Sequence, residues 1–117
     1  MLMIRKAQMH TLGRERHKDF ARRAGQHLCA SFAECAALPP EQLRTFVSDG
    51  IAKAARYGIE SEQEVCKFLN LLVVFGPEFD TELAWARKTL AAKDGASLRL
   101  NRLYARGIRV ADGEDLA

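Results

Sequence analysis

Cysteine and histidine are the residue types of this sequence that could bind a metal ion or act as nucleophiles. Cys29 and Cys35 are six residues apart, and His27 lies two residues before Cys29. Positions six apart on a continuous helix point about 240° away from each other, so one ion could not take both thiolates. We therefore predict no metal site in this segment.

The remaining candidates for chemistry also fit ordinary structural roles. His10 and His17 share a helix face, but seven residues rise about 10.5 Å, which is too far for two ligands of one ion. Cys66 stands beside an apolar run near acidic residues, surroundings that disfavour a reactive thiolate. No glycine-rich phosphate loop, serine nucleophile elbow or inward carboxylate pair can be assembled. We predict a protein without catalytic residues, metal or cofactor.

Basic side chains form two groups that could bind an acidic partner. Three of them share one face of a helix expected near the N-terminus, and we name them the N-terminal basic face: Arg14, Lys18 and Arg22. Four others fall within about 80° of a helical wheel near the C-terminus, and we name them the C-terminal arginine stripe: Arg99, Arg102, Arg106 and Arg109. We predict that these seven residues bind the partner, and that the stripe lies opposite Leu100, Tyr104 and Ile108.

Acidic residues gather in a different part of the sequence. Residues 60–82 hold six Asp or Glu and one Lys, whereas the whole chain carries a formal charge of +3. Charge segregated in this way suits docking on a complementary protein surface. A helix-turn-helix around Gly58 would present Glu60, Glu62 and Glu64 to the phosphates of DNA, which argues against nucleic acid as the partner.

The elements that position these side chains are expected to be helices. The 117 residues include few β-branched side chains, three prolines and eight glycines, and Ala, Leu, Arg and Glu are frequent. Apolar spacing of three and four residues predicts five helices. Their ranges are about 14–37, 40–57, 62–75, 80–92 and 97–106. We expect an all-α bundle in a single domain over residues 1–110, followed by a flexible acidic tail over 111–117.

Glycine and polar residues mark the predicted helix ends. Gly13 should separate a short leading turn from the first main helix, and Gly58 should end the second helix in a left-handed conformation, with Ile59 closing the stop. Ser61 and Glu64 form a capping box for the third helix. Caps for the last two helices are expected from Asp80 or Thr81, and from Ser97.

The third predicted helix is apolar almost all round. It should therefore lie centrally in the bundle, with a narrow polar strip of Lys67 and Asn70 facing water or a partner. Its apolar run, residues 65–75, is too short to span a membrane and contains that strip. No signal peptide is visible, and three cysteines without framework spacing fit a reducing compartment. We expect a cytoplasmic protein without a membrane partner.

Several short runs resemble one group of bacterial proteins. These runs are Gly50-Ile51, residues 54–59, Glu64-Val65-Cys66 with Phe68, and residues 75–80, together with an opening Met3-Ile4-Arg5 and Ala7-Gln8-Met9. Over about residues 1–85 the chain is similar to small proteins encoded beside type VI secretion effector, spike-tip and adaptor genes in Gram-negative bacteria. The resemblance implies a cytoplasmic accessory protein that binds an effector or its loading adaptor, or an immunity protein.

The function that we predict is non-catalytic protein binding as an adaptor or co-chaperone-like accessory of a type VI effector. The first alternative is an immunity protein that neutralises a cognate toxin, and a third hypothesis is a small DNA-binding regulator. The sequence leaves the oligomeric state open.

Overall fold

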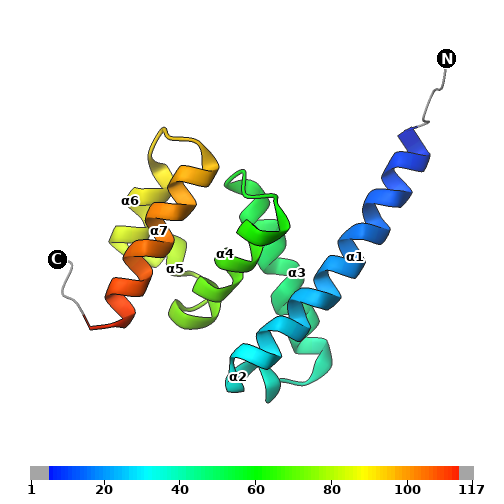
Figure 1. Cartoon of the computed structure of the whole chain (residues 1–117), viewed down its shortest axis with the longest axis horizontal. Coiled ribbons are helices and arrows are strands. Elements are labelled where there is room, and N and C mark those ends of the chain that lie inside the picture. Colours follow the sequence, from blue (N-terminus) through cyan, green and yellow to red (C-terminus); the bar gives the residue numbers. More distant parts are fainter. Residues whose placement is uncertain (1–5, 114–117) are drawn as a thin grey trace. The chain divides into compact units, whose positions relative to one another are not determined.

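The computed structural model describes the backbone of residues 6–113 and the side chains of residues 18–113. Within this part of the chain every regular element is a helix, which confirms the all-α prediction (Figure 1). The helices are α1 (Lys6–Ser31), α2 (Ala33–Ala36), α3 (Pro40–Arg56), α4 (Glu62–Phe75), α5 (Phe79–Glu82), α6 (Ala84–Ala91) and α7 (Ala96–Ala111). No described helix is both long enough and apolar enough to cross a membrane.

The chain divides into two compact units, Met1–Thr45 and Phe46–Ala117, and the division falls inside α3. In the first unit, the apolar positions Phe20, Ala24 and Leu28 of α1 are buried, as their four-residue spacing predicted. The second unit contains most of α3 and the whole of α4 to α7.

The helix boundaries near Gly13, Phe32 and Leu83 differ from the prediction. Gly13 does not separate a leading turn, because α1 runs without a break from Lys6 to Ser31. Phe32 has extended backbone angles and starts the separate helix α2. Leu83, also extended, divides the predicted fourth helix into α5 and α6. The two short helices α2 and α5 therefore come in addition to the five predicted.

The turn between α3 and α4 has the predicted geometry. Gly58 has a φ of +79°, and its N–H and that of Ile59 donate to the carbonyl oxygens of Ala55 and Ala54, each at 3.0 Å. These two bonds are the Schellman motif, and the buried Ile59 closes it. Ser61 then caps α4 as predicted, because its hydroxyl accepts the N–H of Glu64 at 3.3 Å. The Glu64 carboxylate accepts from the Ser61 hydroxyl at 2.8 Å, whereas the capping box predicts the Ser61 N–H as its donor.

The predicted caps of the later helices are wrong. Helix α5 begins after Glu78 and α6 after Leu83, and neither N-cap side chain accepts a hydrogen bond from an N–H of its own helix. Asp80 lies inside α5, and its buried carboxylate accepts hydrogen bonds from the side chains of Lys53 and Tyr57. Gly95 is the N-cap residue of α7, so Ser97 falls within the first turn of the helix. Helix α7 also extends past residue 106 to Ala111, and residues 114–117 of the predicted tail lie outside the described part.

One face of α4 and a chain of aromatic rings belong to the core of the second unit. Phe68 has its ring centre 6.1 Å from that of Tyr57 and 5.6 Å from that of Phe79. Phe75 continues the chain, 6.4 Å from Phe79 and 5.3 Å from Trp85 in an edge-on arrangement. Such tilted and edge-on pairs suit the charge distribution of aromatic rings. The buried residues of α4 are Val65, Phe68, Leu69, Leu71 and Leu72.

Two buried glycines let helices of the second unit approach α4 closely. A Cβ atom at Gly50 of α3 would lie 2.9 Å from Leu72 Cδ1 and would also overlap Leu69. A Cβ atom at Gly107 of α7 would lie 2.8 Å from Leu71 Cδ2. Real Cβ contacts are longer than this, so a side chain at either position would force these buried leucine side chains to move.

Candidate functional site

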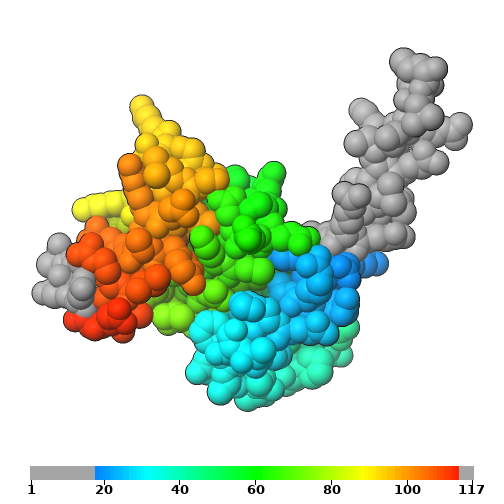
Figure 2. Space-filling model, viewed as in Figure 1, coloured from blue at the N-terminus to red at the C-terminus, as the bar shows by residue number. Residues whose placement is uncertain are grey.

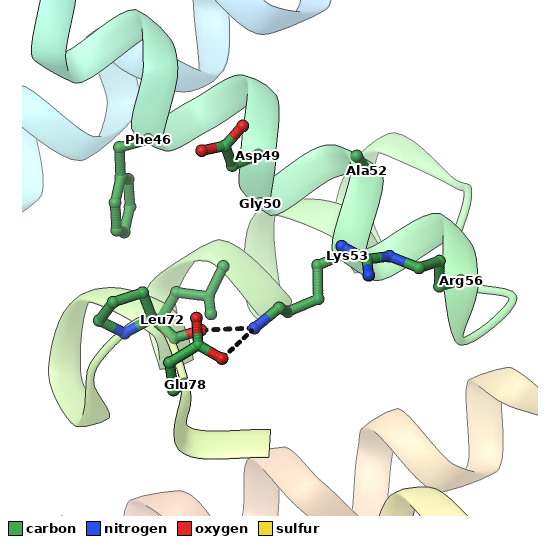
Figure 3. A pocket seen from close by; sticks show the side chains of 9 residues that line it. Phe46, Asp49, Gly50, Ala52, Lys53, Arg56, Leu72 and Glu78 are labelled. Carbon is green, nitrogen blue, oxygen red and sulfur yellow. Dashed lines mark hydrogen bonds and ion pairs between the residues drawn. The ribbon is translucent and has the colours of Figure 1, made fainter. Parts of the chain in front are cut away.

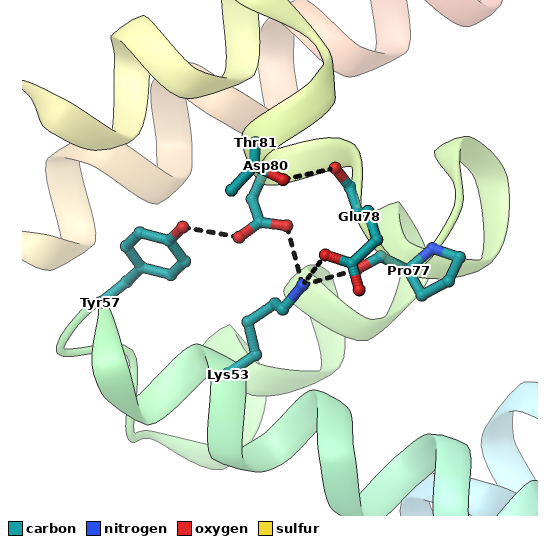
Figure 4. A network of polar contacts seen from close by, with 6 residues as sticks. All are labelled: Lys53, Tyr57, Pro77, Glu78, Asp80 and Thr81. Carbon is teal, nitrogen blue, oxygen red and sulfur yellow. Dashed lines mark hydrogen bonds and ion pairs between the residues drawn. The ribbon is translucent and has the colours of Figure 1, made fainter.

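The most buried charged group described is the carboxylate of Asp80 in α5, whose side chain is only 3% exposed. Lys53 of α3 and Tyr57, which directly follows α3, hold it, as Figure 4 shows. Lys53 Nζ donates to Oδ1 at 2.9 Å, and the Tyr57 hydroxyl donates to Oδ2 at 2.6 Å. Lys53 and Tyr57 are four residues apart, one helical turn, so both side chains reach the same carboxylate.

The electrostatics of this cluster follow from burial and pairing. Burial raises the pKa of Asp80, but the hydrogen bonds from Tyr57 and Lys53 outweigh it, so the pKa lies below its ordinary value. Burial, together with the hydrogen bond to the Asp80 carboxylate, raises the pKa of Tyr57 to about 12. At neutral pH the cluster therefore holds an ionised aspartate and a neutral phenol.

Lys53 uses all three of its protons inside the cluster. Besides Asp80, its ammonium donates to the Pro77 carbonyl oxygen at 2.6 Å and to the Glu78 carboxylate at 3.3 Å. A charged, fully hydrogen-bonded ammonium is a poor nucleophile and a poor base. Lys53 therefore connects α3 to α5 and to the segment that precedes α5.

A hollow of about 260 Å³ lies next to Lys53 in the second unit (Figure 3). Its charged lining balances, with Lys53 and Arg56 against Asp49 and Glu78. Small-molecule pockets typically have volumes of about 300–1,000 Å³, and a few convergent polar groups fix the ligand. Lys53 is already paired with Glu78 and Asp80, so the hollow favours neither an anionic nor a cationic ligand.

Arg99 is the first residue of the predicted C-terminal arginine stripe, and its side chain forms hydrogen bonds to backbone groups of the protein itself. Its guanidinium donates to three carbonyl oxygens: that of Tyr57 at 2.7 Å, that of Leu90 at 2.9 Å and that of Asp94 at 3.0 Å. Tyr57 and Leu90 lie at the C-terminal ends of α3 and α6, where carbonyl groups lack helical partners. Arg99 therefore holds helix ends together.

The other three arginines of the stripe differ in how exposed they are. Arg102 is exposed and forms an ion pair with Asp94 at the end of the α6–α7 loop. Arg106 is half-buried, whereas Arg109 is exposed. Of the residues expected opposite the stripe, Leu100 is buried and Tyr104 half-buried, but Ile108 is 52% exposed.

The N-terminal basic face is described in part. The side chain of Arg14 lies outside the described residues, while Lys18 and Arg22 are exposed. Arg22 and its neighbour Arg23 bind Asp19 at 2.8 and 2.9 Å. These hydrogen bonds lower the pKa of Asp19, and the carboxylate reduces the positive charge of the face. The sequence interpretation omitted Asp19, although its spacing of three and four to the arginines marks such pairs.

Cys29 and Cys35 were expected on one continuous helix, and this prediction is wrong because the helix ends before Phe32. The break brings Cys29 Sγ to 3.7 Å from the carbonyl oxygen of Cys35. Burial raises the pKa of the Cys35 thiol, and no group of three metal-binding side chains occurs among the residues described. The side chains of His10 and His17 lie outside that part, and His27 is exposed.

The outward side of α7 combines aliphatic and basic residues, and the sequence reasoning missed this combination. We define the α7 outer face as six exposed residues: Leu98, Asn101, Arg102, Ala105, Ile108 and Arg109. Leu98 and Ile108 are 45% and 52% exposed, and both are among the few large apolar residues so exposed in the described chain. The signal was present as a spacing of three and four residues from 98 to 108 on the side away from Leu100 and Leu103.

Comparison of the chain with protein families, with curated proteins and with solved structures gave no match in any of the three.

Proposed function

We propose that this chain is a non-catalytic protein-binding accessory, adaptor or co-chaperone-like, of a type VI secretion effector in the cytoplasm. The observation that carries the proposal is the α7 outer face. It places Leu98 and Ile108 in water beside Arg102 and Arg109 on one helix. Apolar residues with arginine at the edge are typical of protein interfaces, in which arginine is enriched and other charged residues are depleted.

The polar clusters of the chain support a binding role over a catalytic one. Lys53, Asp80 and Tyr57 satisfy one another, and Arg99 is used by helix ends. Catalysis needs a group that is held close to a substrate with a proton or electron pair to exchange. The donors of Lys53, Tyr57 and Arg99 bind groups of the protein itself, so we take the surface of α7 as the better candidate for a binding site.

The type of partner is proposed from the sequence resemblance. Runs such as residues 54–59 and 75–80 are similar to proteins encoded beside type VI effector and adaptor genes. Several residues of these runs have structural roles, such as the Gly58 stop and the buried Phe79 and Asp80. The runs therefore support kinship, while the α7 outer face supports the binding role.

Co-expression with the products of neighbouring genes tests the proposal. An accessory should co-purify stoichiometrically with an adaptor, a spike-tip protein or a full effector. The variant Arg102→Gln/Arg109→Gln should lose the partner, whereas reversal of Arg14, Lys18 and Arg22 to Glu tests the N-terminal basic face in the same way. Capture of the toxin domain alone, with protection of cells by this chain alone, would establish the immunity alternative instead.

Nucleic-acid binding provides a second discriminating measurement. With the α7 arginines partly used inside the fold and a net charge of +3, few phosphates can be neutralised. Binding to random duplex DNA at about 150 mM salt should have a Kd weaker than about 10⁻⁴ M. A micromolar Kd that depends steeply on salt would favour the regulator hypothesis.

A further inference from the structure

We infer that the α7 outer face docks an amphipathic helix of the partner protein, one that carries aliphatic residues along a seam and Asp or Glu along one flank. The inference rests on the proposed protein-binding function and specifies the chemistry of the partner. Figure 2 shows α7, in orange to red, uncovered along much of its length on the face in view.

The spacing of the apolar and small residues fits a helix as the occupant. At 100° per residue, the six residues of the α7 outer face lie within about 120° of arc. Leu98, Asn101, Ala105 and Ile108 follow the alternating three-and-four spacing of a coiled-coil seam. From Leu98 to Ile108 the seam is about 15 Å long, which matches about three turns of a second helix.

The middle of the seam allows close approach. Ala105 is exposed and small, so a partner helix can reach the usual interaxial distance of about 8–10 Å without displacing a large side chain. Asn101 places one polar group in the seam, and a single polar residue at such a position favours one register of pairing. Leu98 and Ile108 then supply apolar contact at both ends.

Charge selects an acidic occupant. Helix α7 contains four arginines and no acidic residue. Arg102 and Arg109 are seven residues apart, so they line the same edge of the seam, and both are exposed. The ion pair of Arg102 with Asp94 is itself exposed, and such pairs contribute only about 0–1 kcal/mol, so exchange for a partner carboxylate costs little.

A second copy of this chain fits the face less well. In an antiparallel pairing of two α7 helices, Arg102 and Arg109 would face the same arginines of the other copy. In a parallel pairing they would face Ser97 and Tyr104, which carry no negative charge. The charge of the face is therefore complementary to an acidic helix from another protein.

Two labelled peptides of about 21 residues test the inference, both with leucine along the seam positions. One carries Glu and the other Lys at the flanking positions. Fluorescence anisotropy with the full chain should show a Kd for the acidic peptide at least about tenfold lower than for the basic one. The difference should shrink between about 50 and about 500 mM salt.

Matched variants locate the binding. Leu98→Gln/Ile108→Gln removes the apolar seam, and Arg102→Gln/Arg109→Gln removes the charge; each should weaken acidic-peptide binding by at least about tenfold. Lys88→Gln/Lys93→Gln removes the same charge from exposed positions outside the face and should change Kd by less than about twofold. In the wild-type chain, the acidic peptide should slow amide hydrogen exchange in residues 96–111 and leave residues 46–56 unchanged.

Each result decides one claim. Equal binding of the two peptides, or acidic-peptide binding that both face variants leave unchanged, overturns the inference. Duplex DNA that displaces the peptide from α7 at lower concentration than unlabelled peptide also overturns it. If the peptide binds at α7 but no type VI protein co-purifies, the inference stands and the proposed function fails. If a type VI protein co-purifies while the acidic peptide fails to bind, the proposed function stands and the helix inference fails.

Discussion

The guanidinium of Arg99 donates a 2.7 Å hydrogen bond to the carbonyl oxygen of Tyr57, which lies 42 residues earlier in the chain. Tyr57 in turn donates from its hydroxyl to the buried Asp80, at 2.6 Å. Through these two bonds a residue of α7, the end of α3 and the buried carboxylate of α5 are connected. These polar groups of the second unit therefore join three of its helices.

Replacing Arg99 with Ala should destabilise the fold by about 2–3 kcal/mol, because three carbonyl groups lose a charged donor and two of them end helices. Urea unfolding followed by circular dichroism measures this change. Arg102→Ala is the matched control on the same helix and should cost about 0–1 kcal/mol, since its ion pair is exposed. Similar losses for the two variants would show that the Arg99 contacts contribute little.

Asp80 makes stability depend on pH in acid. Its pKa is lower in the folded chain than its value of 3.8 without the fold, so its contribution is complete above that value and is lost as pH falls through the folded pKa. The free energy of unfolding should therefore decrease below about pH 4. Asp80→Asn should remove part of this decrease and cost about 3 kcal/mol at neutral pH, because Lys53 loses its buried partner. A variant with wild-type stability and pH profile would contradict this account.

Tyr57 should make the stability of the fold depend on pH in base. Its pKa is raised from 10.0 to about 12 in the folded chain, so the stability that it contributes is present below pH 10.0 and is lost as pH rises toward 12. Absorbance of the phenolate near about 295 nm, recorded on the folded chain, should show a late tyrosine titration. That late step should disappear in Tyr57→Phe and remain in Tyr104→Phe. Its persistence in Tyr57→Phe would assign the shift to another group.

Local signals predicted the turn between α3 and α4 almost completely. The Gly58 stop, the buried Ile59 and the cap by Ser61 were all readable, because each depends on residues within a few positions. The break at Leu83 was not predicted, because this residue carries no helix-stopping chemistry of its own. Asp80 had the residue type of a helix cap, but Lys53 and Tyr57, far away in sequence, determine its place.

The candidate surface was predicted only in part for a related reason. A helical wheel groups arginines by angle but does not show which neighbours a helix will have. Arg99 lay within the predicted stripe, yet the ends of α3 and α6 take up its donors. Ile108 looked apolar and therefore inward, yet α7 turns it outward beside Arg109. Surface function on a helix depends on its packing partners, which periodicity alone does not specify.

Glycine at position 50 should be required for the packing of α3 on α4. Gly50→Ala adds a Cβ atom 2.9 Å from Leu72 Cδ1, so buried leucine side chains must change rotamer, at a cost of about 1–3 kcal/mol. Ser48→Ala is the control, since Ser48 is an exposed residue of the same helix. It should change stability by less than about 0.5 kcal/mol. Equal effects in thermal unfolding would mean that the helices adjust freely around Gly50.

Truncation of Leu72 tests whether α4 has the central place that its apolar sequence predicts. Leu72 is 3% exposed, and its Cδ1 atom lies against Gly50 of α3. Leu72→Ala should cost about 2–5 kcal/mol, because it removes buried methyl groups and leaves a cavity between two helices that a glycine already holds close. The control is Val74→Ala on the same helix, which is 50% exposed and should cost less than about 1 kcal/mol. Chemical denaturation of both variants gives the comparison. If Leu72→Ala lowered the free energy of unfolding by less than about 1 kcal/mol, the central place of α4 would be contradicted.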